Sequence, residues 1–244
     1  MQVPWEGLFS LQGDSMQTWF RCLFVVSVAA FLLLIILSGT HSGASEEAGF
    51  ASLFNGKDLS GWAYGLREGR ENKAGKGYQV EKGVLFCTQE DGGNLYTEKE
   101  YSDFIFRFEF RLETNANNGI GIRAPLEGNA AYAGMEIQVL DDDGPDYKDL
   151  RPVQYHGSIY DVIPSKRGAL KKLGEWNFEE ITAKGRQITI KLNGTAIVDA
   201  NLDDVKDPDV LKKHPGLART AGRIGFLGHG TRVEFRNLRI KALP

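Results

Sequence analysis

Two polar side chains interrupt a run that otherwise reads as a buried strand. In GMEIQVL, Met135, Ile137 and Val139 alternate with Glu136 and Gln138. Successive side chains of a strand point to opposite faces, so the apolar row would enter the core and the polar pair would share the outward face. There the carboxylate and the carboxamide would offer directed hydrogen bonds to a ligand.

Two further segments carry groups that could lie beside this pair on neighbouring strands. In NGIGIRAP, the same alternation places Gly121 and Arg123 on the outward face. In HGSIYDV, His156, Ser158 and Tyr160 share one face. A cluster of such groups would suit a polyhydroxylated ligand such as a sugar. An ordinary solvated face is the competing interpretation, because one face of an antiparallel sheet commonly meets water.

The histidines and an aspartate run raise the question of a metal. His156 and His229 stand in glycine-flanked contexts, YHGS and GHGT, where an imidazole could be a ligand, an acid or base, or a structural group. His214, in KKHPG, reads as a loop residue. The run DDDGPD at 141–146 could offer oxygen ligands to Ca²⁺, but its spacing differs from that of a calcium loop and a solvated turn is the simpler interpretation. No cofactor is certain, and a divalent metal stays open.

Several functional classes are disfavoured by the composition and by missing motifs. Charged residues make up 25% of the chain and the net charge is −3, so no nucleic-acid partner is expected. The chain has no G-x-S-x-G elbow, phosphate loop or dinucleotide fingerprint, which argues against a serine nucleophile and nucleotide chemistry. Cys22 falls within the N-terminal apolar run and Cys87 is the single cysteine after it, so the expected domain can form no internal disulfide.

The elements that would position these groups are predicted to be short antiparallel strands. The 29 glycines and 14 phenylalanines favour strands joined by tight turns, and Glu81-Lys82-Gly83 and Asn193-Gly194 mark hairpins. A short helix is expected to begin at Asp207-Pro208. We therefore expect an all-β protein, an antiparallel β-sandwich of jelly-roll type with one or two short helices. Its strongest strand, SDFIFRFEFRLE, would bury one row of side chains: Phe104, Phe106, Phe108, Phe110 and Leu112.

The N-terminal 44 residues differ from the rest. After Arg21 comes the apolar run CLFVVSVAAFLLLIIL and then the small-residue stretch SGTHSGAS, which together indicate an export signal. The run is slightly long for a cleaved signal and slightly short for a span of roughly 20 residues. Residues 1–44 are thus expected to be a signal peptide or an N-terminal membrane anchor. Residues 45–244 would form one exported domain, periplasmic, secreted or on the cell surface.

From about Phe50 to the C-terminus, the chain resembles the 3-keto-disaccharide hydrolase domain family. The resemblance implies a concanavalin A-like jelly roll and an enzyme that cleaves glycosides whose sugar carries a ketone at C3, with a carbohydrate as its substrate. It rests on six segments in the same order: FNGKDLSGW, NNGIGIRAP, YAGMEIQVLDD, YHGSIYDVIP, GEWNFEEITAKGRQITIKLNG and GFLGHGTRVEFRNLRIK.

A C3 ketone acidifies the proton on C2, so the glycosidic bond could break by proton abstraction and elimination. Such a site needs a base, a group that stabilises the enolate and an acid for the leaving group. We expect Glu136 to be the base and Arg123, or a metal near His156, to be the electrophilic partner. His156 or His229 would be the acid. The residues expected to bind the sugar are Gln138, Tyr160, Trp176, Asn177 and His229.

Three rival interpretations remain at this point. A non-catalytic carbohydrate-binding module would use the same sandwich, because a fold does not fix a function. An ordinary glycoside hydrolase would pair Glu136 with Asp141 or Asp161 as a second carboxylate. A purely structural module would have no polar cluster at all. The chain also departs from one common version of the family pattern, since Leu227 and Gly228 stand where a glutamine and an acidic residue are frequent.

Overall fold

The computed structural model describes residues 48–65, 77–88 and 93–244. The expected signal peptide or anchor at 1–44 lies outside these residues. Within them, no helix is both long enough and apolar enough to cross a membrane.

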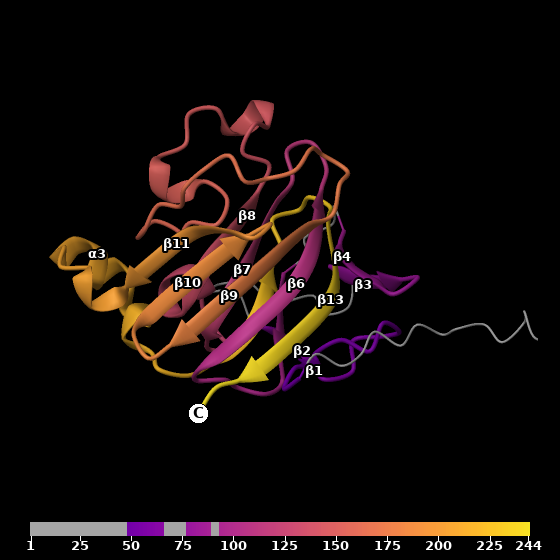
Figure 1. Ribbon diagram of the computed structural model, residues 1–244, viewed down its shortest axis with the longest axis horizontal. Helices are drawn as coiled ribbons and strands as arrows, with labels where there is room; N and C mark the ends of the chain where they lie inside the picture. The colour runs from indigo at the N-terminus through magenta and orange to yellow at the C-terminus, as the bar shows by residue number, and fades with distance from the viewer. Residues whose placement is uncertain (1–47, 66–76, 89–92) are drawn as a thin grey trace, which may run out of the picture. The chain divides into compact units, whose positions relative to one another are not determined.

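Two antiparallel sheets make up the domain, and Figure 1 shows β6, β9, β10 and β13 of the larger sheet in front of β7 and β8 of the smaller one. The all-β sandwich prediction is confirmed. The larger sheet has the order β11 (Thr195–Asn201), β10 (Gln187–Leu192), β9 (Asn177–Lys184), β6 (Phe104–Leu112), β13 (Val233–Ala242), β4 (Val84–Cys87) and β3 (Tyr78–Glu81), and β1 (Ala51–Ser52) also pairs with β13. The smaller sheet has the order β2 (Trp62–Gly65), β5 (Asn94–Thr97), β12 (Arg223–Leu227), β7 (Asn117–Ala124) and β8 (Met135–Leu140).

The core lies between the two sheets. Strand β6 alternates buried and half-buried residues along its whole length, as its sequence predicts, and its phenylalanine row is fully inside. From the smaller sheet, the apolar rows of β7 and β8 pack into the same core and include Ile120 and Ile137. Phe226 and Phe235 bring the sheets together, with ring centroids 4.3 Å apart. Because the inward row of each strand supplies the core, the side chains of the outward row of the smaller sheet are not needed for core packing and are available to form a binding site.

Both predicted hairpin turns are present. Lys82 and Gly83 have φ of 50° and 81°, and Asn193 and Gly194 have φ of 50° and 87°. Positive φ at both central residues is the geometry of the type I′ turn, whose twist matches that of the flanking strands.

The helices are short. The predicted helix is α3 (Pro208–Lys213), where the Asp207 carboxylate caps the N-terminus by accepting from the backbone N–H groups of Asp209 and Val210. A second short helix, α2 (Ala130–Ala133), agrees with the expected one or two, although its position was not predicted from the sequence. Single turns of 3₁₀ helix complete the set: η1 (Pro145–Tyr147), η2 (Pro152–Gln154), η3 (Leu202–Asp204) and η4 (Pro215–Ala218).

His214 lies between α3 and η4, outside regular secondary structure as its context predicts, but its side chain is buried. It is 1% exposed, it ends α3, and its Nδ1 lies 3.0 Å from the carbonyl oxygen of Ala131. The imidazole therefore ties the end of α3 to α2.

The segment HGSIYDV is not a strand, contrary to the prediction. It forms turns held by single bridges from Ile159 to Ile137 and to Ile163. Gly157 and Asp161 have φ of 78° and 63°, and such left-handed residues interrupt an extended backbone. The expected alternation is lost for that reason.

Arg123 does not lie on the outward face with Glu136, so that prediction is wrong. Arg123 has a φ of 47°, so the extended backbone of β7 is interrupted at this residue and its side chain does not follow the alternation of the strand. The residue is fully buried. The guanidinium donates to the carbonyl oxygens of Ser102, Gly185 and Arg219 and to the Asp103 carboxylate, at 2.8–3.3 Å. Arg123 thus joins several loops at one end of the sandwich.

His156 also faces the interior. Its ring stacks on Phe110 with centroids 5.0 Å apart, and its Nδ1 accepts a hydrogen bond from the N–H of Leu140 at 3.3 Å. Its Nε2 lies 3.1 Å from Oε2 of Glu179, and both side chains are at most 1% exposed. This buried pair connects the segment after β8 to strand β9 of the other sheet.

We predict that Glu179→Ala lowers the free energy of unfolding by about 3 kcal/mol, because removal of one partner leaves the other polar group buried and uncompensated. The exposed Glu81 is the control, since it pairs with Lys82 at 3.2 Å on the surface. Glu81→Ala should cost no more than about 1 kcal/mol. Urea unfolding of both variants checks this, and equal losses would contradict a structural role for the buried pair.

Arg123→Ala is expected to destabilise the domain by about 3–5 kcal/mol, since its acceptors lose a buried cation. Arg236, which pairs with Glu109 at 2.6 Å on the outer face, serves as the control and should cost about 1 kcal/mol when replaced by alanine. Chemical denaturation of the two variants provides the comparison. An unchanged unfolding midpoint for Arg123→Ala would refute this assignment.

Candidate active site

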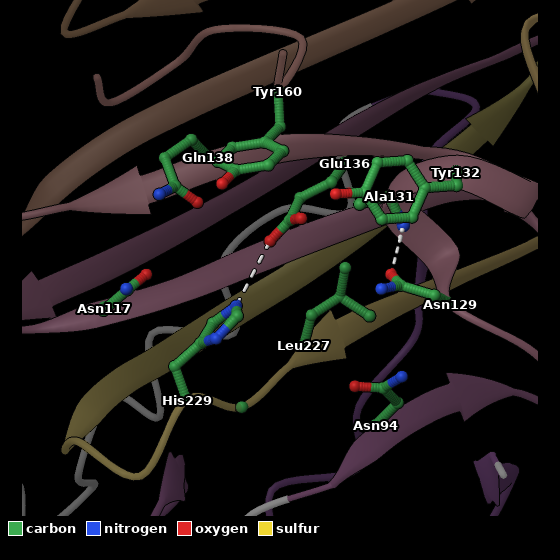
Figure 2. A pocket seen from close by; sticks show the side chains of 11 residues that line it. Asn94, Asn117, Asn129, Ala131, Tyr132, Glu136, Gln138, Tyr160, Leu227 and His229 are labelled. Carbon is green, nitrogen blue, oxygen red and sulfur yellow. Dashed lines mark hydrogen bonds and ion pairs between the residues drawn. The ribbon is translucent and has the colours of Figure 1, made fainter. Parts of the chain in front are cut away.

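A cavity of about 280 Å³ opens on the outward face of the smaller sheet. Figure 2 shows Glu136 and His229 in its middle, with the other lining side chains around them. Four of the predicted site residues, Glu136, Gln138, Tyr160 and His229, come together here. The complete lining is Asn94, Asn117, Asn129, Ala131, Tyr132, Glu136, Gln138, Tyr160, Leu227, Gly228 and His229.

Glu136 is the carboxylate of the cavity. It is 5% exposed, and its Oε1 lies 3.4 Å from Nε2 of His229 (Figure 2). A β-carbon built on Gly119 would lie 2.1 Å from the same oxygen, so glycine at 119 leaves the space that the carboxylate occupies. His229 follows β12 and is about one third exposed, which lets its ring meet both Glu136 and a bound molecule.

Two carboxamides present unused acceptors to the cavity. Asn117 Oδ1 and Gln138 Oε1 are buried, and neither accepts a hydrogen bond from the residues that the structure describes. A buried acceptor without a partner costs about 1–3 kcal/mol, and each such case in a folded protein calls for a reason. A ligand with hydroxyl groups would supply the missing donors.

Two tyrosines form walls above the Glu136 carboxylate, with Tyr160 on the Gln138 side and Tyr132 on the opposite side (Figure 2). The Tyr160 hydroxyl accepts a hydrogen bond from Nε2 of Gln154 at 3.1 Å, so its own proton remains available to a ligand. Aromatic rings beside hydrogen-bonding groups are suited to the apolar faces and hydroxyls of a sugar.

Tyr132 is held from behind. The ring centroid of Tyr132 lies 5.0 Å from that of His214 and 5.5 Å from the ammonium nitrogen of Lys213. Lys213 also bonds the Asp161 carboxylate at 2.5 Å, so the segment that carries Tyr160 is tied to the end of α3. Both tyrosine walls are thereby anchored to the same lysine.

Asp161 does not act as a second carboxylate of the cavity. Its side chain turns to Lys213 and Arg151. Burial alone would raise the pKa of Asp161, but the Lys213 hydrogen bond and the charges of Lys213 and Arg151 together hold this pKa below its ordinary value. Its role is to brace the segment.

The first two residues of the aspartate run are also hydrogen-bonded within the protein. Oδ2 of Asp141 accepts from the Asn115 N–H at 2.9 Å, and Oδ1 of Asp142 accepts from the His156 N–H at 2.7 Å. Across the described ranges, no group of three or more histidine, cysteine, aspartate or glutamate side chains could hold a metal ion. Glu136 is accordingly the carboxylate that lines the cavity in the described structure.

Four predicted site residues lie elsewhere. Arg123 and His156 are buried as described above. Trp176 lies outside the cavity, and the guanidinium groups of Arg111 and Arg236 lie over its ring at 4.8 and 4.0 Å from the ring centroid. The fourth is Asn177, whose Oδ1 accepts from Lys171 N and Asn193 Nδ2, both at 2.9 Å.

Several lining residues were not identified from the sequence. Asn117 could have been, because it shares the outward row of β7 with Gly119, two positions away. Asn129 caps the N-terminus of α2 and Tyr132 lies within it, and the four residues of this helix are too few to show a helical period. Asn94 lies on β5, which was not predicted as a strand.

The chain matches the family model described as the 3-keto-alpha-glucoside-1,2-lyase-like domain over residues 49–241. It is similar to a 3-keto-disaccharide hydrolase of Bacteroides thetaiotaomicron, with 26% identity over 236 residues, covering 81% of this chain and 80% of that protein.

Two crystal structures from Parabacteroides distasonis, both described provisionally as glycosyl hydrolases, resemble the domain with a TM-score of 0.65. One is 26% identical and the alignment covers 80% of this chain and 94% of that one. The other is 25% identical, with 80% and 99% covered. Since the family model spans most of the chain, this protein belongs to the 3-keto-alpha-glucoside-1,2-lyase-like domain family.

Proposed function

We propose that this protein cleaves the glycosidic bond of glycosides whose sugar carries a ketone at C3. The name of the Bacteroides relative, a 3-keto-disaccharide hydrolase, and the family description support this substrate class. The observation that carries the proposal is the Glu136 carboxylate, 5% exposed, facing the His229 imidazole at 3.4 Å in a cavity with hydrogen-bonding walls.

This arrangement favours elimination over the usual glycosidase mechanism. Retaining and inverting glycosidases need two carboxyl groups roughly 5–9.5 Å apart across the bond. The lining of this cavity contains Glu136 and no second carboxylate in the described structure, and the two candidates, Asp141 and Asp161, are bound to other groups. Removal of a proton next to a ketone needs a single base, which the cavity has.

The proposed reaction begins when Glu136 takes the C2 proton and the electron pair passes to the C3 oxygen as an enolate. When the C3 carbonyl forms again, a double bond forms between C1 and C2 and the bond from C1 to the leaving oxygen breaks. His229 gives the leaving oxygen its proton. Addition of one water across the double bond, hydroxyl to C1 and hydrogen to C2, completes a hydrolysis.

Stabilisation of the enolate falls to other residues than those expected from the sequence, because Arg123 and His156 are away from the cavity. The Tyr160 hydroxyl is our candidate donor to the C3 oxygen, since Gln154 already occupies its acceptor side. Gln138 and Asn117 would bind neighbouring hydroxyls through their unused oxygens. In this proposal the cavity selects a sugar by hydrogen bonds on several sides.

Glu136→Gln is expected to lower turnover of a 3-keto-glucoside by about 10²–10⁴-fold, because the amide cannot accept the C2 proton. Sugar affinity should stay within about tenfold, since the shape and most of the hydrogen bonds persist. Steady-state kinetics and calorimetric binding measure the two effects. Glu180→Gln, a charge change on the other sheet, is the control and should retain full turnover.

Other outcomes distinguish the rival functions. Sugar binding without turnover by the wild-type protein across a panel of 3-keto glycosides would indicate a carbohydrate-binding module. Cleavage of unoxidised glycosides at a similar rate would indicate an ordinary glycosidase. Unchanged turnover in Glu136→Gln would remove Glu136 from the role of base.

A further inference from the structure

The floor of the cavity has a direction, which follows strand β7. The outward row of this strand runs from Asn117 through Gly119 to Gly121. A β-carbon on Gly119 would lie 2.1 Å from Oε1 of Glu136, so the carboxylate lies over the middle of the row. A β-carbon on Gly121 would lie 3.4 Å from Cδ2 of Leu227, so the leucine lies over one end. Glu136 therefore lies between Asn117 on one side and Leu227 on the other (Figure 2).

Hydrogen-bonding groups gather at the Asn117 end. Gln138 is the cross-strand partner of Gly119 and is 4% exposed, and its Oε1 has no hydrogen-bond partner among the described residues. The Tyr160 ring lies on the same side, and its hydroxyl can still donate. A sugar ring that carries hydroxyls and a ketone matches the acceptor and the donor that this end offers.

The Leu227 end offers a different surface. Leu227 is 4% exposed and belongs to a small apolar cluster that is separate from the main core. Ala131 and the ring of Tyr132 line the cavity beside it (Figure 2). The buried members of the cluster are Tyr96, Ala124, Ala130 and Leu227. A molecule that extends from Glu136 in this direction thus meets methyl groups and an aromatic ring.

Two asparagines also line this part of the cavity, but neither replaces the apolar contact. Oδ1 of Asn129 accepts from the Ala131 N–H at 3.1 Å and caps α2, so this acceptor is already engaged. Asn94 is the cross-strand partner of Leu227 on β5, so β12 and β7 separate it from the strand that carries Glu136. A group attached at the reacting carbon therefore meets Leu227 before it reaches Asn94.

The proposed reaction determines which part of the substrate occupies each end. C2 of the sugar is bonded to both C1 and C3, and its proton has to face Glu136. When the C3 oxygen accepts from Tyr160 on the Gln138 side, C1 lies on the opposite side of C2. The leaving group is attached at C1 and extends towards Leu227.

We propose that Leu227 determines the leaving-group specificity of this enzyme: it favours 3-keto glycosides whose leaving group is an apolar ring or chain over those whose leaving group is a second sugar. This inference rests on the proposed function, because the position of the base orients the substrate. A sugar hydroxyl against the Leu227 methyl groups would lose its water without gaining a hydrogen bond. An apolar ring would instead bury surface there.

Two substrates with the same 3-keto-glucosyl unit and the same anomeric configuration test the proposal: a 3-keto-disaccharide and a cyclohexyl 3-keto-glucoside. Neighbouring oxygens make a sugar hydroxyl the better leaving group, so intrinsic reactivity favours the disaccharide. We expect kcat/KM of the wild type to be higher for the cyclohexyl glycoside, by about tenfold. An equal or lower kcat/KM for this substrate would overturn the proposal.

Leu227→Asn keeps the branching at Cγ and replaces two methyl groups with a carboxamide. We expect the ratio of kcat/KM for the cyclohexyl glycoside to that for the disaccharide to fall by about tenfold. A loss of folded protein would lower both rates equally, so the ratio reports specificity alone. Leu173→Asn is the matched control, since Leu173 is 47% exposed and outside the cavity lining, and it should leave the ratio unchanged.

The outcomes separate this inference from the function on which it rests. Cleavage of both substrates with an unchanged ratio in Leu227→Asn would refute the role of Leu227 and leave the proposed function standing. Cleavage of neither substrate by the wild type would refute the proposed function, and the inference with it. The wild-type comparison decides the proposal even where the variant does not fold.

Discussion

The candidate site depends on a carboxylate held nearly out of solvent above a strand position that has no side chain. Oε1 of Glu136 occupies the space that a β-carbon at Gly119 would fill. Behind it, Ile137 is fully buried between the sheets, so a slip of one residue in β8 would place the carboxylate in the core and the isoleucine in the cavity. Because the same register fixes core and site, the base is positioned by the sheet rather than by a loop.

Strand alternation predicted the fold and the centre of the site for one physical reason. Both β6 and β8 are extended over their whole length, so a period of two assigns every side chain to a face. The same reasoning failed for Arg123 and His156. Arg123 itself has a left-handed backbone, and His156 is followed by Gly157 with a φ of 78°. Residue type does not reveal such a φ, least of all at an arginine, and one such residue is enough to turn a side chain away.

The remainder of the site could not be read from local pattern because it comes from short elements and distant contacts. Strand β5 has four residues and α2 has four, too few for either period to show. The wall residue Tyr132 is held by His214 and Lys213, which follow it by about 80 positions. Trp176 was expected to bind sugar because of its type, yet on the outer face of the larger sheet its ring is already covered by two arginines.

The buried polar groups divide according to whether they lie within the core and the loops around it or at the cavity. Arg123 is fully engaged by carbonyl and carboxylate oxygens, and His156 faces Glu179, so these groups serve the fold. Asn117 and Gln138 face the cavity with acceptors that the described residues leave unused. A buried acceptor without a hydrogen bond carries a free-energy penalty. A ligand without matching donors would not remove this penalty when it binds, so it would bind more weakly than a ligand with such donors. In our proposal these unused acceptors favour a hydroxyl-rich molecule that can hydrogen-bond to several walls at once. That preference is argued from the pairing of side chains, independently of the family to which the domain belongs.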